Sequence, residues 1–302
     1  MTFHAQRLQD FLALPFQPRE FASAITPQTW VQSYLDRPVS CLSALPSRAQ
    51  TRAEVYATCR DESLSFEHRF ICAMAWGSQM PRNARLTWVH LERVAKIVEH
   101  VYRGGLTREH AYALFCGKQA IAGLGPAYFT KLLFFFSPQP SFFIMDQWTA
   151  KSINYLASED VVPLSPGSEQ TNGPCPRHNS GATYARYCKL VDQLAQLHTP
   201  PLTGEQTEQK LFCSGSPNVG PWRAMIRAAY PRHAARPERT TRRVALEAAA
   251  RTPTKTSIAW AIFESNPKAP RAQLIARFMA EAQLTKAGAS TYYQNFRKSE
   301  RE

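Results

Sequence analysis

Two glycines that flank a single leucine interrupt an otherwise helical stretch near the middle of this 302-residue chain. Residues 119–136 read QAIAGLGPAYFTKLLFFF, so Gly123, Leu124, Gly125 and Pro126 separate an incoming segment from a strongly apolar outgoing one. Glycine tolerates positive φ and brings no side chain into a turn. Proline suits the first position of a helix, where no amide hydrogen is needed. The pattern therefore predicts that an incoming helix and an apolar outgoing helix form a tight hairpin.

The predicted hairpin also has chemical consequences. Backbone amides at the start of the outgoing helix have no partner within that helix, and they favour an anion such as a DNA phosphate. Leu124 can fill the space between the two helices. Because helix connections often use glycine, an ordinary turn is the alternative interpretation of this motif taken alone.

One acidic residue follows the hairpin. Asp146 lies 21 positions after Gly125, at the end of the apolar run Phe142–Met145 and before a helical segment, Trp148–Leu156. An aspartate in such a position is typical of a helix N-cap, which is the structural alternative. A hairpin and an aspartate together are rarer by chance than either alone. Residues 142–151 are therefore a candidate catalytic segment.

Apolar residues recur at helical spacing along most of the chain, and only Asp160–Leu164 has any strand-like alternation. Thr107 is expected to cap one helix, and Gly104 with Gly105 to end another. We expect polar loops at residues 78–83 and 157–182. The expected helices are Phe66–Gly77, a segment from Trp88 to Tyr102, Arg108–Lys118, Tyr184–Leu197, Glu205–Phe212 and Trp222–Tyr230. The predicted fold class is all-α.

The C-terminal part of the chain has its own organisation. A proline-bounded basic segment, PRHAARP, begins at Pro231, and we interpret residues 231–253 as a linker. The predicted domains are a helical domain at residues 1–230 and a small helical module at residues 254–302. Within the module, helical patterns lie near 255–264, 271–282 and 288–298.

Positive charge is concentrated towards the C-terminus. The net charge is +13, and residues 1–218 contain 20 Lys and Arg against 17 Asp and Glu, whereas residues 219–302 contain 16 against 6. Such a concentration indicates a polyanionic partner, most often nucleic acid. A basic, solvated tail is the alternative.

Several classes of protein are disfavoured by the sequence. The seven cysteines contain no C-x-x-C pair, so we expect neither structural zinc, nor an iron–sulfur cluster, nor a disulfide framework. No run of 18 apolar residues is present, and the N-terminus has no secretory signal pattern. These features predict a cytoplasmic protein without a membrane partner.

The hairpin and Asp146 at this spacing resemble the helix-hairpin-helix DNA glycosylases, in particular the bacterial branch with an OGG fold. The resemblance covers roughly Phe66–Tyr230, and its motif core is Gly123–Lys131 with Ile144–Trp148. It implies a hairpin that grips DNA phosphates beside a lesion, often through a sodium or potassium ion. It also implies that Asp146 is the catalytic carboxylate in a pocket for an extruded nucleotide.

The resemblance leaves the substrate open. Some branches act on 8-oxoguanine, and others, linked to anti-phage defence, remove bulky modified cytosines such as glucosylated hydroxymethylcytosine. Bifunctional members have a lysine two residues after the second glycine, where this chain has Ala127. The resemblance therefore implies a monofunctional enzyme. Lys131, one helical turn later, is a second candidate catalytic residue, although contact with phosphate or solvent is the favoured interpretation.

The chemistry of base removal requires few residues. Cleaving an N-glycosidic bond develops positive charge on the sugar, and one buried carboxylate can stabilise it and orient the attacking water. No metal is needed. The target base must first be flipped out into a pocket with aromatic or apolar walls. Candidate walls are Phe129, Phe143, Trp148 and Trp222, with ordinary core packing as the alternative for each.

The last helical pattern begins with Gly288 and reads GASTYYQ to Gln294. Polar and aromatic residues alternate there with cations, and Arg297 with Lys298 are candidate DNA contacts in a helix-turn-helix-like module. A helical bundle that docks on a protein is the alternative. Further candidate contacts with the DNA gap or flipped base are Gln79–Arg85 and Gly220–Trp222.

These observations predict a monomeric DNA glycosylase that acts on double-stranded DNA with a modified base. One alternative is a catalytically silent DNA-binding adaptor, for which a carboxylate near phosphates brings no advantage. Another is a transcription regulator that uses the terminal module as its reader, but the sequence contains no ligand motif that a sensor domain would need.

Overall fold

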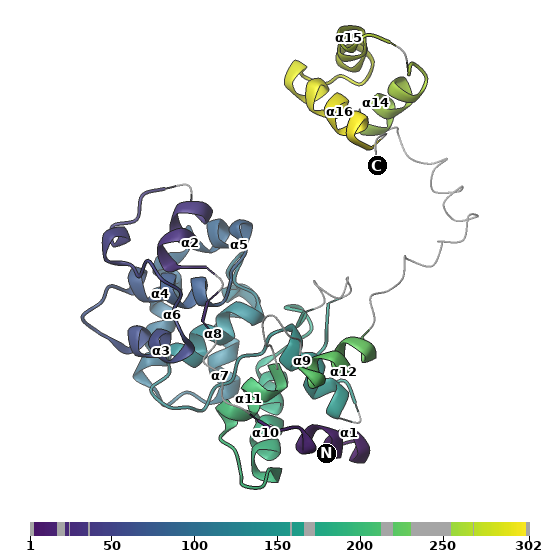
Figure 1. The fold of residues 1–302 in the computed structure, drawn as a ribbon. Coiled ribbons are helices and arrows are strands. Elements are labelled where there is room, and N and C mark those ends of the chain that lie inside the picture. Colours follow the sequence, from purple (N-terminus) through teal and green to yellow (C-terminus); the bar gives the residue numbers. More distant parts are fainter. Residues whose placement is uncertain are drawn as a thin grey trace. The chain divides into compact units, whose positions relative to one another are not determined.

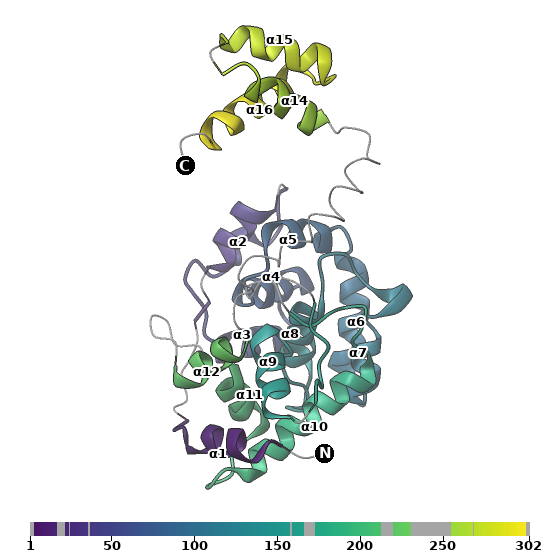
Figure 2. The same ribbon diagram turned by 90° about the vertical axis from the view of Figure 1, so that its right-hand side faces the viewer.

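The computed structural model is helical through the part of the chain that it describes (Figures 1 and 2). The described residues are 3–16, 22–23, 25–35, 37–157, 159–165, 173–212, 220–230, 255–267 and 269–299. Their only strand-like pairings are isolated bridges, Phe3 with Ala157, Ala22 with Thr51, and Leu164 with Pro174. The predicted all-α class is confirmed.

Two units make up the chain, Met1–His233 and Ala234–Glu302. The predicted linker at residues 231–253 lies outside the described residues. Among the described helices, none has the length and apolar character needed to cross a membrane. Each unit has its own hydrophobic core.

The helices of the first unit run as follows: α1 (Ala5–Ala13), α2 (Pro27–Tyr34), η1 (Leu42–Ala44), α3 (Arg52–Arg60), α4 (Phe66–Trp76), α5 (Pro81–Trp88), α6 (Leu91–Arg103), α7 (Arg108–Ala113), η2 (Gly117–Gln119), α8 (Pro126–Phe136), α9 (Gln147–Leu156), α10 (Gly181–Leu197), α11 (Gly204–Phe212) and α12 (Pro221–Ala229). Most of the helices expected from Phe66 onward are found within one to three residues of their predicted bounds.

Local sequence explains many of these helix ends. The side chains of Thr51, Ser65 and Thr107 each accept a hydrogen bond from an amide in the first turn of α3, α4 and α7. Such caps satisfy amides that have no partner inside the helix. Gly104 ends α6 with a φ of 77°, a conformation that glycine adopts without strain.

The first unit contains two groups of helices, each arranged around a central one (Figure 2). α8 is buried along nearly its whole length and packs against α3, α4, α6 and α7. α9 packs against α1, α10, α11 and α12. Residues 137–146 connect the two central helices, so Asp146 stands where the two groups meet.

Two sequence predictions in this unit were wrong. Residues 78–83 were expected to be a loop, but α5 begins at Pro81 and is separate from α6. The helix expected at Arg108–Lys118 ends at Ala113, and only the 3₁₀ turn η2 precedes the hairpin. Proline at the first position of α5 starts a helix that its polar composition had hidden.

The second unit is a three-helix bundle of α14 (Lys255–Glu264), α15 (Arg271–Glu281) and α16 (Lys286–Ser299). Leu274, Phe278 and Ala282 are buried, as the pattern predicts, and they pack with Phe263 and Phe296. All three predicted helical patterns are found within about two residues of their expected bounds.

Candidate active site

The hairpin is docked on α5. Gly123 has a φ of 79°, and a Cβ there would lie 2.3 Å from Asn83 O, so both its conformation and its surroundings require glycine. The buried Gln79 donates from Nε2 to Gly123 O at 3.1 Å and to Thr87 Oγ1 at 3.0 Å. These contacts fix the turn relative to the surface of α5.

The remaining hairpin residues play different parts. Leu124 is buried, and Pro126 is the first residue of α8, as predicted. Gly125 has an ordinary φ of −74°, and the nearest atom to a Cβ there would be Pro176 Cγ at 3.9 Å. Glycine at this position is not required by the fold, but it leaves the start of α8 accessible.

The alkali cation that the resemblance implies would be held by backbone carbonyls of the hairpin. Ile121 O accepts from Leu124 N at 3.1 Å, and Ala122 O accepts from Thr87 Oγ1 at 3.3 Å. Gly123 O accepts from Gln79, as described above. Each of these oxygens accepts a hydrogen bond from the chain itself and retains a second lone pair that suits a cation.

Asp146 is the N-cap of α9. Its Oδ1 accepts from Trp148 N at 2.8 Å and from Thr149 N at 3.0 Å, and its own amide donates to Thr149 Oγ1 at 3.0 Å. The N-cap role that the sequence allows for Asp146 is therefore confirmed. Its other oxygen, Oδ2, accepts no hydrogen bond from the described residues. Capping thus fixes the carboxylate and leaves one oxygen for another partner.

A hydrogen-bond relay joins Asp146 to the helix that follows the hairpin. Thr130 Oγ1 donates to Pro126 O at 2.7 Å within α8 and accepts from Met145 N at 3.0 Å. All three residues are buried. The residue before Asp146 is therefore attached directly to the first turns of α8, which relates the catalytic segment to the hairpin.

Lys131 lies on α8 beside this relay and is buried, with 7% of its surface exposed. A Cβ at Gly77, the C-cap of α4, would lie 2.7 Å from Lys131 Cδ, so glycine there makes room for the side chain. Its Nζ donates to Ala127 O at 2.6 Å. Contact with solvent, part of the favoured sequence interpretation, is wrong because α4 covers the stem.

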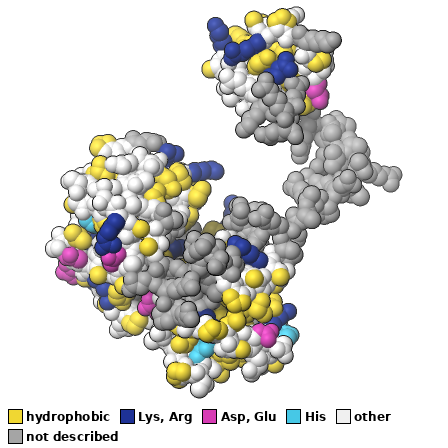
Figure 3. Space-filling model, viewed as in Figure 1, with side chains coloured by type: hydrophobic (Ala, Val, Ile, Leu, Met, Phe, Trp, Pro, Cys, Tyr) yellow, Lys and Arg dark blue, Asp and Glu magenta, His cyan; other side chains and the backbone are white. Residues whose placement is uncertain are grey.

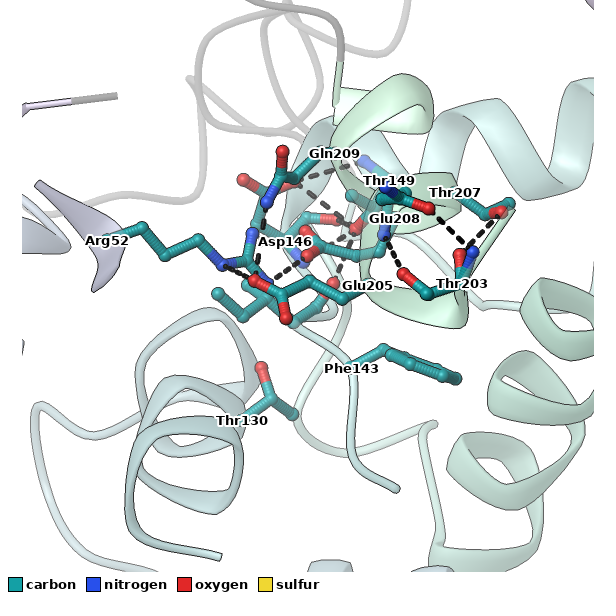
Figure 4. Close-up of polar contacts among 12 residues, drawn as sticks. Arg52, Thr130, Phe143, Asp146, Thr149, Thr203, Glu205, Thr207, Glu208 and Gln209 are labelled. Carbon is teal, nitrogen blue, oxygen red and sulfur yellow. Dashed lines mark hydrogen bonds and ion pairs between the residues drawn. The ribbon is translucent and has the colours of Figure 1, made fainter. Parts of the chain in front are cut away.

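Three more charged residues, Arg52, Glu205 and Glu208, gather around Asp146 (Figure 4). Arg52, at the start of α3, reaches Glu205 Oε1 from Nε at 3.1 Å and Glu208 Oε2 from Nη2 at 2.6 Å. Its guanidinium also lies 4.0 Å from the ring centroid of Phe134. Arg52 and Glu208 are almost completely buried, whereas the Glu205 side chain is 39% exposed.

Burial and charge shift the pKa values of this cluster. Burial raises the pKa of Glu208 to about 7, opposed by Arg52 and reinforced by Asp146. Burial lowers the pKa of Lys131, while the carboxylates of Asp146 and Glu208 oppose that shift. Burial raises the pKa of Tyr187, to which Glu208 and Asp146 also contribute. These residues therefore share one electrostatic environment.

Three of the four aromatic residues expected to line a base pocket belong to the core. Phe129, Phe143 and Trp222 are each exposed by 2% or less. Phe143 lies so close to Gly204 that a Cβ there would be 2.3 Å from its ring. Trp222 donates from Nε1 to Ser152 Oγ at 3.0 Å. Their apolar character reflects packing, and in this structure they present no face to a base.

Trp148 is the exception, because it is only half-buried. Cations of α9 and α12 surround its ring: Arg223 at 3.9 Å, Lys151 Nζ at 4.8 Å and Arg227 at 5.6 Å from the ring centroid. Of the four aromatic candidates, it remains the one at the surface beside Asp146.

The C-terminal candidates lie in the second unit. Arg297 is half-buried, donates from Nε to Tyr293 Oη at 3.3 Å and lies 5.3 Å from the Phe263 ring. It therefore contributes to the packing of the bundle. Lys298 belongs to α16, and its side chain lies outside the described residues.

Sequence reasoning missed Arg52 and Glu208. They are 156 positions apart, and each is an ordinary residue of an amphipathic helix when seen alone. The spacing of Glu205 and Glu208 on one helical face is a signal, but nothing in the sequence says what that face contacts.

Comparison with models of known protein families shows which family the chain belongs to. The model of the OGG family, described as "Putative 8-oxoguanine DNA glycosylase OGG-like protein", matches residues 13–212. The chain belongs to this OGG-like family. The matched region contains the hairpin, Lys131, Asp146 and both glutamates of α11, and it leaves α12 and the second unit outside. No curated protein and no solved structure matches the chain.

OGG-like family membership suggests DNA glycosylase activity and DNA as the substrate. It also agrees with the all-α fold of the first unit. The resemblance drawn from the hairpin and Asp146 is therefore confirmed at the level of the family.

Proposed function

We propose that this protein is a monofunctional DNA glycosylase in which Asp146 is the catalytic carboxylate. The supporting observation is the relay through Thr130, which attaches the segment before Asp146 to the helix that begins at the hairpin. A hairpin that holds a phosphate would thereby hold the nucleotide in a fixed relation to the carboxylate. Correct relative placement of reacting groups is a large part of catalysis.

The free oxygen of Asp146 suits the chemistry of base release. As the N-glycosidic bond breaks, the base leaves with the bonding electrons and positive charge develops on the sugar. A fixed carboxylate oxygen stabilises that charge and orients water for attack on C1′. Water then adds its hydroxyl to the sugar, its proton is taken up by the carboxylate or solvent, and an abasic site remains.

Exposed cations beside the hairpin support a DNA-facing surface. α5 carries Arg82 and Arg85 with exposed side chains, and it is the helix on which Gly123 is docked. In Figure 3, Lys and Arg side chains and apolar side chains reach the surface together near α5. Met80 and Val89 are 60% and 59% exposed at the ends of this helix. Phosphate contacts and apolar contacts with an opened duplex both fit this composition.

The substrate is proposed on the family description, which names 8-oxoguanine. Modified cytosines of viral DNA are the second substrate, proposed on the sequence resemblance. The test uses duplexes that contain 8-oxoguanine, glucosylated hydroxymethylcytosine or only ordinary bases, incubated with the full-length protein. Mass spectrometry of released bases is expected to detect one modified base and none from the ordinary duplex. Binding without release from any duplex would instead indicate a catalytically silent adaptor.

A further inference from the structure

The Asp146 carboxylate lies in the same cluster as a buried arginine, Arg52 (Figure 4). Asp146, Arg52 and Glu208 lie together in Figure 4. The charges of all three act on Lys131, and those of Asp146 and Arg52 also act on Glu208. A catalytic carboxylate stabilises the positive charge on the sugar less well when a permanent cation pairs with it, because the cation offsets its negative charge. The arginine must therefore be held elsewhere.

Two glutamates hold it. Glu205 and Glu208 occupy neighbouring positions on one face of α11 and lie along the same edge of the Arg52 guanidinium. Nη2 donates a hydrogen bond to Glu208 at 2.6 Å, whereas Nε is only in ion-pair range of Glu205, at 3.1 Å. The ring of Phe134 lies 4.0 Å from the guanidinium carbon and limits its movement. Arginine presents its donors in a rigid planar fork, so two carboxylates can occupy that fork together.

We propose that Glu208 is a positioning residue for base release, because it occupies the Nη2 end of Arg52 and so leaves the Asp146 carboxylate free to face the sugar. This inference rests on the proposed glycosylase function. Glu208 does not touch the substrate. When Glu208 loses its negative charge, Arg52 keeps only the ion pair between Nε and Glu205, and its Nη2 becomes available to Asp146.

The charged and titratable groups around Glu208 define what its protonation does. They are Arg52 on α3, Lys131 on α8, Asp146 at the start of α9, Tyr187 on α10 and Glu205 on α11 itself. Burial places the pKa of Glu208 at about 7, so it changes charge near neutral pH. Protonation at lower pH has the same effect on Arg52 as removal of the charge by mutation. The wild-type rate should therefore rise with pH through neutrality.

The test is the single-turnover rate of base release by the full-length protein, at saturating enzyme and at pH values from about 5.5 to 8.5. Glu208→Gln is expected to lower the rate about tenfold or more at the alkaline end and to leave it nearly unchanged at the acidic end. Glu99→Gln, which removes an exposed charge on α6 outside the site, is the matched control. It should change the rate less than about threefold, because its more exposed charge interacts more weakly.

A second substitution separates positioning from mere packing. In Arg52→Met with Glu208→Gln, the arginine that would neutralise Asp146 is absent, so the rate should recover and lose its neutral pH dependence. A purely structural ion pair would give a double variant that is no faster than Glu208→Gln. If Glu208→Gln does not fold, Glu208→Asp should show the same loss at alkaline pH in weaker form, because its shorter side chain reaches Arg52 less well.

Several results would overturn this inference while leaving the proposed function intact. These are a Glu208→Gln pH profile parallel to that of the wild type, a failure of the double variant to recover, or an equal effect of Glu99→Gln. In each case the wild type releases a base. Failure of the wild type to release any base would instead contradict the proposed function itself.

Discussion

At Lys131, burial and the neighbouring carboxylates shift the pKa of the ammonium in opposite directions. The ammonium has three donors, and among the described residues one acceptor, Ala127 O, is engaged. Burial of a charge with few partners destabilises a fold, so a residue kept in that state is a candidate for function.

The first prediction concerns Lys131→Met, which keeps the length of the side chain and removes its charge. The free energy of unfolding is expected to stay the same or to rise by about 1 kcal/mol, because a buried charge is lost. If Lys131 takes part in the reaction, base release falls while DNA affinity changes little. Thermal unfolding, binding and single-turnover assays measure the three effects. Lys118→Met on η2 is the matched control, since Lys118 is exposed.

The second prediction concerns covalent chemistry. Ala127 stands where lyase members of the superfamily have a lysine, so borohydride should trap no efficient adduct between the protein and its DNA substrate. A trapped adduct would contradict the monofunctional assignment. Its loss in Lys131→Met would then identify Lys131 as the amine, and its persistence would point to another residue.

The third prediction concerns the pH dependence of stability. The pKa of Glu208 is raised to about 7 from 4.5, so the folded protein binds a proton that the unfolded chain releases. This group therefore contributes stability that is complete below about pH 4.5 and is lost as pH rises through 7. Relative to Glu208→Gln, the wild type should lose up to about 3 kcal/mol over that range. Equal slopes for both proteins in denaturant titrations would contradict this.

At the scale of elements, the hairpin offers two glycines with different roles. Gly123 is required by its positive φ and by its contact with Asn83, whereas Gly125 has an ordinary backbone and open space around it. The fold therefore depends on the first glycine, and we propose that DNA contact depends on the second.

The fourth prediction compares alanine at these two positions. Gly123→Ala should lower the free energy of unfolding by about 2–4 kcal/mol through strain and overlap. Gly125→Ala should change it by less than about 1 kcal/mol, yet weaken DNA binding by placing a methyl group at the start of α8. Chemical denaturation and fluorescence anisotropy with duplex DNA measure the two effects. Equal destabilisation by both substitutions would contradict the separate roles.

Elements whose signals are local could be predicted from the sequence. Apolar periodicity and caps located α4, α9 and α10, and the Gly-Leu-Gly-Pro pattern located the turn before α8. The start of α5 was missed, because its exposed residues show little apolar periodicity and its main signal is Pro81. The pattern of apolar and polar residues predicts local conformation more reliably than it predicts which surface packs against the element.

Long-range contacts could not be predicted in the same way. The burial of Lys131 depends on Gly77 from another helix, and the Arg52–Glu208 pair joins residues far apart in the chain. Phe129, Phe143 and Trp222 were plausible pocket walls by chemistry alone, but apolar composition does not distinguish a core from a binding pocket. Asp146 could be chosen as the candidate carboxylate because its spacing from the hairpin carries information that its residue type does not, and its catalytic role stays a prediction.

At the scale of the whole molecule, the two units differ in their relation to the family. The OGG-like match ends at residue 212, while residues 238–302 carry 12 Lys and Arg against 6 Asp and Glu. Asp146, the hairpin and Lys131 all belong to the first unit. The second unit is therefore expected to contribute affinity more than chemistry.

The fifth prediction is that removal of residues 238–302 weakens DNA binding more than it slows base release at saturating enzyme. Each phosphate contact contributes a slope of about −0.9 to the dependence of log affinity on log salt, so the truncated protein should show a shallower slope. Binding isotherms at several salt concentrations measure it. An unchanged slope would indicate that the second unit docks on a protein, and lost release at saturating enzyme would place it in the active site.

The most direct test of the catalytic assignment is base release by Asp146→Asn under single-turnover conditions. Asparagine caps helices about as well as aspartate, so this change removes the charge while retaining the cap of α9. We predict that release falls by at least about a thousandfold, with DNA affinity and the unfolding midpoint close to wild type. Asp61→Asn, on an exposed turn after α3, should release the base normally. Release by Asp146→Asn near the wild-type rate would contradict the account.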